Sequence, residues 1–241
     1  MIQFSVHHLS KSALYALLSS VTIVAMLLAG FFLAEPSISY GQVDTSNDFT
    51  IRQTIVDETA FLVQPSNVTT SGSINGVTGG NASGTTEFSV ISNNSTGYRV
   101  EISFFDNATD EAMIGDADAD QSIRDYDGDV GGQPSYGYTA SSAAQFAYTV
   151  TSLQPTDTAQ SFLNNASVCN SSGGSQNGTA TSTKCWKAPA TTGFEIVNRS
   201  NAAVTGATST LEFDITVPSG ASPVPTAQTY TATATLTLFT Q

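Results

Sequence analysis

The residues with the clearest chemical potential form one acidic segment, residues 106–129, which holds nine acidic side chains and a single cation, Arg124. Within it, Asp116, Asp118 and Asp120 are spaced as in a calcium-binding loop, which offers oxygen ligands at positions 1, 3 and 5. A second run of aspartates surrounds Gly128. The pattern indicates a candidate calcium site formed by some of six residues: Asp116, Asp118, Asp120, Asp125, Asp127 and Asp129.

The match to a calcium loop is incomplete at two positions. Position 6 is Gln121, where the sharp turn of such a loop requires glycine, and position 12 is Asp127, where a bidentate glutamate is usual. The helical patterns that flank such loops are also missing from the sequence. A solvated acidic loop is therefore the simpler interpretation, and calcium binding is the alternative; both stay open.

The two cysteines, Cys169 and Cys185, are predicted to form a disulfide, because an isolated pair in an exported chain is most simply oxidised. In the chain-entropy model, closing a loop of this length stabilises the fold by about 3 kcal/mol. A zinc site would need further ligands. Both histidines, His7 and His8, lie in the N-terminal segment, and there is no third cysteine.

Catalysis is not expected. If the N-terminal segment is removed, no histidine remains for a Ser-His-Asp or Cys-His arrangement. The glycines around residues 72–76 lack the lysine and the helix of a phosphate-binding loop. We therefore expect no enzyme and no cofactor other than the calcium considered above.

The N-terminus has the order of a secretory signal: a single lysine, Lys11, then an uncharged run over residues 12–34, then small residues at Ser39 and Gly41. We expect cleavage after Gly41, so that residues 1–41 are the signal peptide. The alternative is an uncleaved membrane anchor, because residues 12–34 are long enough to span a bilayer. Both interpretations place the rest of the chain outside the cytoplasm, extracellularly or at the cell surface.

The charge balance limits the partners. The chain has 20 acidic and 7 basic residues and a formal net charge of −13. An anionic surface repels phosphate backbones, so nucleic acid is not an expected partner. Membrane contact is expected only through residues 12–34, if they are not removed. The length of residues 42–241 suits one domain with a sizeable core.

Alternating apolar and polar residues predict half-buried strands in this domain. The clearest are residues 87–92, 98–104, 211–217 and 229–239; shorter candidates are residues 49–56, 60–63, 68–74, 146–151 and 194–197. Residues 93–97 are expected to form the turn of a hairpin. No long helical stripe follows the signal helix. We therefore expect an all-β fold, an antiparallel two-sheet β-sandwich of immunoglobulin-like or jelly-roll type.

The turn NNSTGY, the cysteine block CNSSG…KCW and the ending TYTATATLTL resemble a large group of uncharacterised secreted β-sandwich proteins of candidate-phylum bacteria. More weakly, the turn and the final strand resemble the spore coat protein U-type and WxL-type surface domains. The likeness covers most of residues 49–238. It implies a sandwich at the cell surface and supplies no catalytic residues.

Three functions fit these observations. The first is a secreted, non-catalytic cell-surface protein, a structural, surface-layer or adhesion subunit whose partners are cell-envelope components or copies of itself. The second is an extracellular binding module for carbohydrate or calcium. The third is a pilin-like subunit that assembles by strand exchange. For the C-terminal strand, pairing within its own sheet is preferred over exchange with another chain.

Overall fold

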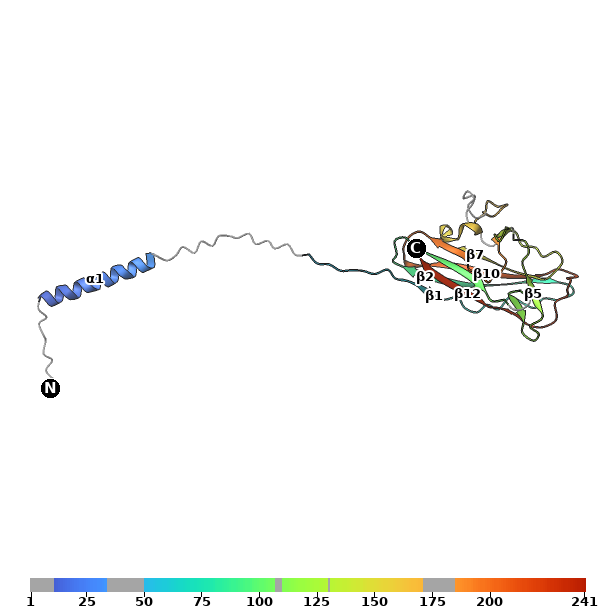
Figure 1. Ribbon diagram of the computed structural model, residues 1–241, viewed down its shortest axis with the longest axis horizontal. Coiled ribbons are helices and arrows are strands. Elements are labelled where there is room, and N and C mark those ends of the chain that lie inside the picture. Colours follow the sequence, from blue (N-terminus) through green and yellow to red (C-terminus); the bar gives the residue numbers. More distant parts are fainter. Residues whose placement is uncertain (1–10, 34–49, 107–109, 130, 171–184) are drawn as a thin grey trace, which may run out of the picture. The chain divides into compact units, whose positions relative to one another are not determined.

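The structure, a computed structural model, describes residues 11–33, 50–106, 110–129, 131–170 and 185–241 (Figure 1). The predicted cleavage point after Gly41 and both histidines lie outside these residues. The chain divides into two units, Met1–Gln53 and Thr54–Gln241.

In the described part of the first unit there is one helix, α1 (Lys11–Leu33). Several hydroxyl groups along it donate to backbone carbonyls one turn earlier, as Ser20 does to Leu17 at 2.8 Å. Such bonds let polar side chains sit in an otherwise apolar helix. Within the described residues, no helix is both long enough and apolar enough to span a membrane.

The second unit is built on a seven-stranded sheet with the order β1-β2-β10-β7-β5-β4-β11. Its strands are β1 (Thr59–Val63), β2 (Gly80–Ser92), β10 (Ala203–Val217), β7 (Gln145–Ser152), β5 (Ser122–Asp125), β4 (Met113–Gly115) and β11 (Tyr230–Ala232). All neighbours are antiparallel except β5 and β7, which run parallel. The sheet is therefore mixed and not purely antiparallel as predicted.

Two smaller antiparallel sheets also lie in the described part of this unit. One has the order β12-β3-β9, with β12 (Ala234–Thr240), β3 (Tyr98–Phe104) and β9 (Phe194–Arg199). The other pairs β6 (Ser135–Tyr136) with β8 (Cys185–Trp186). Short 3-10 helices, η1 (Pro155–Asp157) and η2 (Gln160–Phe162), follow β7. The prediction of an all-β fold after an N-terminal helix is confirmed at this level.

One continuous hydrophobic cluster joins the seven-stranded sheet to the sheet of β12, β3 and β9. On β3 the alternation is complete, because every second side chain from Tyr98 to Phe104 is buried. Aromatic rings meet across the cluster: Phe104 of β3 lies 5.2 Å from Tyr148 of β7, measured between ring centroids. This contact between different sheets is the kind of packing that stabilises layered β proteins.

Three predictions about local structure were wrong. Residues 68–74 form no strand, and neither do residues 50–56; Phe49 lies outside the described residues. Residues 93–97 do form a turn, with Gly97 at φ +90°, where a Cβ atom would meet the Arg199 carbonyl oxygen. The turn does not make a hairpin, because β2 and β3 belong to different sheets.

The single strand predicted over residues 229–239 is divided into β11 and β12, which pair within the chain but belong to different sheets. β11 pairs with β4, and β12 pairs with β3 from Ala234 opposite Phe104 to Thr240 opposite Tyr98. The apolar side chains Tyr230, Ala232, Leu236 and Leu238 pack against the core but stay only partly buried, and Ala234 is exposed.

Candidate functional site

The first three candidate calcium ligands lie in the turn between β4 and β5, and all three are exposed. Asp118 folds the turn, since its Oδ1 accepts the backbone N–H of Asp120 at 3.1 Å. A distant residue fixes the turn from outside: Gln228 Oε1 accepts the N–H groups of Ala117 and Asp118, at 2.9 and 3.0 Å. The backbone of this turn is thus fixed by hydrogen bonds, and the side chains of Asp116 and Asp120 on it are exposed to solvent.

Asp125, at the end of β5, occupies a different environment. Its Oδ1 accepts the Ala112 N–H at 3.1 Å, and its own N–H donates to the Glu111 carboxylate. Burial raises the pKa of Asp125 to about 7, and the nearby charges of Glu111 and Asp106 act in the same direction. Burial likewise raises the pKa of Glu111. A carboxyl of this kind holds its proton in mildly acidic solution.

Asp129 has a partner that the sequence did not reveal. Its carboxylate accepts a hydrogen bond from Lys187 Nζ, and both side chains are largely buried. The other carboxylate oxygen accepts the Ala188 N–H at 3.2 Å. Burial raises the pKa of Asp129, while Lys187 acts in the opposite direction. A buried ion pair that loses one partner leaves an uncompensated charge, so this contact ties the acidic segment to the core.

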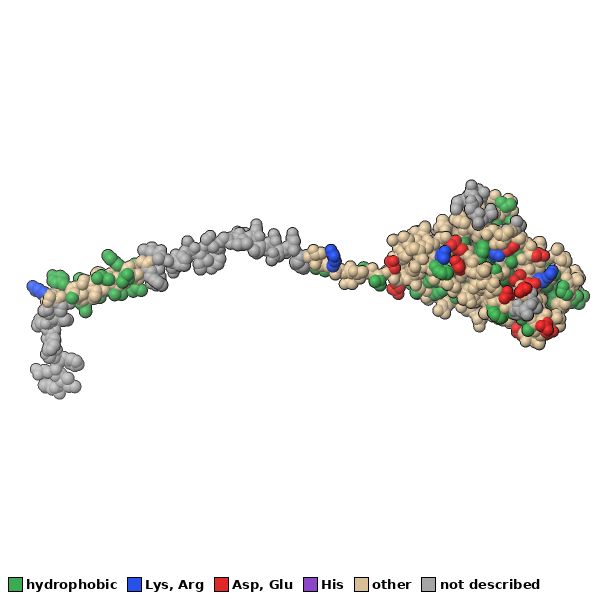
Figure 2. Space-filling view, viewed as in Figure 1, with side chains coloured by type: hydrophobic (Ala, Val, Ile, Leu, Met, Phe, Trp, Pro, Cys, Tyr) green, Lys and Arg blue, Asp and Glu red, His purple; other side chains and the backbone are tan. Residues whose placement is uncertain are grey.

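The six candidate calcium ligands are therefore divided among separate environments, with Asp127 exposed to solvent. In the described ranges, no three His, Cys, Asp or Glu side chains are grouped so as to hold a metal ion. Figure 2 shows acidic side chains, in red, spread over the domain surface in view. Calcium binding stays a prediction, and any such site would have to bring these carboxylates together.

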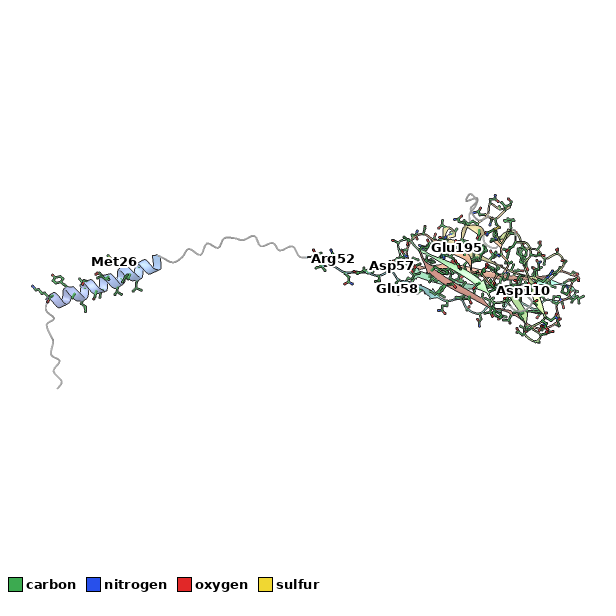
Figure 3. All side chains as sticks on the ribbon, viewed as in Figure 1. Met26, Arg52, Asp57, Glu58, Asp110 and Glu195 are labelled. Atoms are coloured by element: carbon green, nitrogen blue, oxygen red, sulfur yellow. A yellow bond between two sulfur atoms is a disulfide. The ribbon has the colours of Figure 1, made fainter. Side chains whose placement is uncertain are left out.

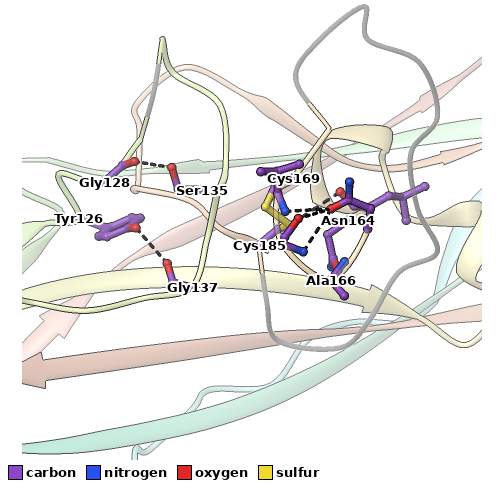
Figure 4. Close-up of a disulfide and its surroundings, with 12 residues drawn as sticks. Tyr126, Gly128, Ser135, Gly137, Asn164, Ala166, Cys169 and Cys185 are labelled. Atoms are coloured by element: carbon purple, nitrogen blue, oxygen red, sulfur yellow. Dashed lines mark hydrogen bonds between the residues drawn. A yellow bond between two sulfur atoms is a disulfide. The ribbon is translucent and has the colours of Figure 1, made fainter.

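The predicted disulfide is present: Cys169 and Cys185 are bonded, with their Cα atoms 5.9 Å apart (Figure 4). A tight turn presents Cys169, with Ala166 at φ +72° and its N–H donating to Asn164 Oδ1 at 3.0 Å. Cys185 is buried on β8. Residues 171–184, most of the loop that the bond closes, lie outside the described residues.

Trp186 packs in the interior and is 6% exposed. It lies in a small aromatic cluster with Tyr126 and Tyr138, whose ring centroid is 5.3 Å from its own. Its ring faces are covered, so this residue is not a platform on which a sugar could stack.

A cavity of about 790 Å³ opens beside the core. Apolar side chains of β3, β7, β10 and β12 line it, together with residues 65–70, 72–76 and 225–232. Gln228 lines it, and the structure gives its buried Nε2 no hydrogen-bond partner. Sequence reasoning missed this cavity, because its lining brings together residues that are far apart in the chain.

The chain matches no protein-family model and no curated protein. Function must therefore be argued from the chemistry of the residues described above.

Replacing Cys169 by serine should lower the free energy of unfolding by about 3 kcal/mol, because the unfolded chain gains the freedom that the loop closure removes. The domain should stay folded, since the rest of its hydrophobic core remains. Urea unfolding of the variant, with the reduced wild-type protein as control, measures this. Two free thiols in the unreduced, denatured protein would contradict the bond itself.

The environment of Asp125 predicts a pH dependence. Its folded-state pKa of about 7 lies above the usual carboxyl value, so the folded state binds the extra proton. Stability should therefore fall as pH rises from about 4 to about 7 and then level off. Asp125→Asn should make this fall smaller, and the part that remains comes from other carboxyls with raised pKa values, such as Glu111 and Asp129. Asp127→Asn, at an exposed position, should leave the fall unchanged. Unfolding midpoints in chelator across that range decide the matter; parallel profiles for the two variants would contradict the prediction.

The calcium hypothesis makes a separate prediction. An ion that binds only the folded protein must raise the melting temperature as its concentration increases. Millimolar calcium should therefore shift the melting curve upward relative to chelator, and Asp116→Asn with Asp118→Asn should abolish the shift. Equal concentrations of magnesium and of sodium chloride are the controls. Coincident curves in calcium and chelator would show a simply solvated loop.

Proposed function

We propose that this protein is an exported, non-catalytic structural subunit of the cell surface, built on an immunoglobulin-like or jelly-roll sandwich. The disulfide supports export, because such bonds persist in oxidising compartments. The basic residue before an apolar helix, and the anionic composition, favour the same location. Adhesion to envelope components is a related role of the same class.

One observation carries the structural role: apolar side chains are left uncovered in an extended segment. Ile51, Ile55 and Val56 are 83%, 82% and 75% exposed. They lie together just before β1, in residues 50–58, which form no strand. Exposed apolar groups that cluster in this way mark surfaces of interaction. Self-association is the interaction that a structural subunit requires.

A second candidate is a binding module, which the cavity favours. Ligand sites are concave and mostly apolar with a few polar groups, and about 300–1,000 Å³ is their usual range. The unpaired Nε2 of Gln228, which lines the cavity, would donate to an acceptor oxygen on an apolar ligand. Trp186 is buried, so it is not accessible for stacking against a sugar ring, and a carbohydrate ligand is not favoured.

Sizing the exported protein separates the two candidates. Full-length protein should be expressed so that the host processes and exports it, and its mass measured by light scattering over a hundredfold range of concentration. A structural subunit should associate more as concentration rises and should fractionate with the cell envelope. A protein that stays monomeric in the medium and shows saturable binding of a small apolar molecule would overturn the structural role.

A further inference from the structure

Lys187 is a lysine held in the interior of the domain. Its side chain is 5% exposed, and the side chain of Asp129, whose carboxylate it contacts, is 12% exposed. By contrast, the acidic residues Asp57, Glu58 and Asp110, which Figure 3 labels, are exposed to solvent. Keeping an amine and a carboxyl group out of water costs free energy that a pair of apolar side chains would not cost.

The backbone of Lys187 is fixed against β7. Its N–H donates to Tyr148 O at 2.9 Å, and the Tyr148 N–H donates to Lys187 O at 3.1 Å. The residue before it, Trp186, is buried, and Cys185 is held by the disulfide. The lysine side chain therefore starts from a rigid part of the domain.

The reacting groups are fixed as well. Lys187 Nζ donates to Ala188 O at 3.1 Å and lies 5.1 Å from the centroid of the Phe194 ring. Asp129 Oδ1 accepts the Ala188 N–H at 3.2 Å, and Asp129 Oδ2 accepts a hydrogen bond from Lys187 Nζ. Because both carboxylate oxygens are bonded to Cγ, the lysine nitrogen lies within van der Waals contact of that carbon.

A second carboxyl group lies on the same face of β7. Asp125 of β5 is in register with Phe146, and Lys187 faces Tyr148 in a β-bridge. Both are on one edge of β7, because β10 pairs with the other edge. Residues two apart on a strand project from one face, so Asp125 and Lys187 are neighbours there, with backbones about 7 Å apart. Burial raises the pKa of Asp125 to about 7, and the charge of Lys187 opposes the rise.

This arrangement suits condensation of the amine with the carboxyl group. A proton passes from Lys187 Nζ to Asp129 Oδ2, which turns two buried charges into a neutral amine and a neutral acid, and burial favours the neutral forms. The amine then attacks Asp129 Cγ at contact distance. The Ala188 N–H stabilises the negative charge that develops on Oδ1, as hydrogen-bond donors do in acyl transfer.

The atoms balance without a co-reactant. A bond forms between Lys187 Nζ and Asp129 Cγ, and the bond between Cγ and Oδ2 breaks. Two of the three ammonium protons leave with Oδ2 as one water molecule. Asp125 relays the second of them, since a carboxylic acid can take a proton from the amine and give one to the leaving oxygen. The amide that remains is uncharged and shielded from hydrolysis by its burial.

We propose that Lys187 and Asp129 become joined by an amide bond between their side chains, so that the ion pair is a site of covalent modification. The proposal goes beyond the structural role and does not depend on it. The disulfide spans 16 residues of sequence, and the amide spans 58 and fastens the acidic segment to the residue after β8. Once joined, Asp129 no longer titrates and contributes nothing to the pH dependence of stability.

Tryptic digestion of the exported, full-length wild-type protein tests the bond. Reduction and alkylation come first, because the disulfide joins the same two tryptic peptides, residues 125–184 and 185–199. Without the amide, trypsin cleaves after Lys187 and releases residues 185–187 and 188–199. With the amide, this lysine is no longer a substrate. Residues 125–184 and 185–199 should then appear as one branched peptide that is lighter than their sum by one water molecule.

The second buried ion pair is an internal control in the same digest. Arg199 pairs with Asp157, and their side chains are 17% and 8% exposed. A guanidinium stays protonated and is not a nucleophile, so trypsin should still cleave after Arg199. Fragmentation of the branched peptide should place its link at Lys187 and Asp129.

Three variants and a control test the chemistry. Lys187→Arg keeps the cation but has no amine, so it should lose the branched peptide. Asp127→Asn, at an exposed position two residues from Asp129, is the matched control and should keep it. At equal times of expression, Asp125→Asn should hold less branched peptide than wild type by about tenfold or more, and Asp125→Glu should restore it. Circular dichroism checks the fold of each.

The decisive readout comes from the wild-type protein and does not require that any variant folds. Complete cleavage after Lys187, with no branched peptide, would overturn the inference and leave a buried ion pair. A branched peptide that persists in Lys187→Arg would also overturn it, because the link would then lie elsewhere. Equal amounts of branched peptide in wild type and Asp125→Asn would overturn the proton relay by Asp125.

Discussion

The described β domain depends on the placement of β10 at the centre of its large sheet. This strand pairs along its length with β2 on one side and with the whole of β7 on the other. Leu211, Ile215 and Val217 all point into the core from it. A slip of one residue in either ladder would turn these side chains to the opposite face. The alternation of β10 therefore fixes two neighbouring strands at once, and β1 and β5 attach to those neighbours.

Two buried ion pairs attach irregular segments to this framework. Lys187 binds Asp129 of the acidic segment, and Arg199, at the end of β9, binds Asp157 in η1 at 2.5 Å. Arg199 also donates to the carbonyl oxygens of Asn201 and Ala202. Each cation thus has an opposite charge and at least one carbonyl acceptor beside it, which offsets the cost of burying a charge. Few basic residues are left for the surface, and the exterior is correspondingly acidic.

Features that depend on neighbouring residues in the chain could be predicted from the sequence, and features that depend on contacts between distant residues could not. β3 was predicted with its true bounds, since one fully buried face leaves a strict two-residue period. Residues 68–74 have a strand-like composition and lie beside β2, but they form no ladder with it. Whether a segment finds a pairing strand depends on the tertiary structure, and the spacing of its apolar residues does not show this. The disulfide was predictable because no other cysteines compete. The pair of Lys187 with Asp129 spans 58 residues and carries no local signal.

The hydrogen bonds between Asn93 and residues 56–58 affect how the domain responds to a pulling force. A pull on the segment before β1 passes first to these backbone hydrogen bonds and then to β1, which lies antiparallel to β2 with Thr59 opposite Ser92. A pull directed along the strands would load the rungs of the β1–β2 ladder together, in shear, whereas a perpendicular pull would open them one after another. Resistance to such a load is set by the rate of unfolding and not by equilibrium stability. The short strand β1 is thus positioned as the strain-bearing joint between the domain and whatever its leading segment is attached to.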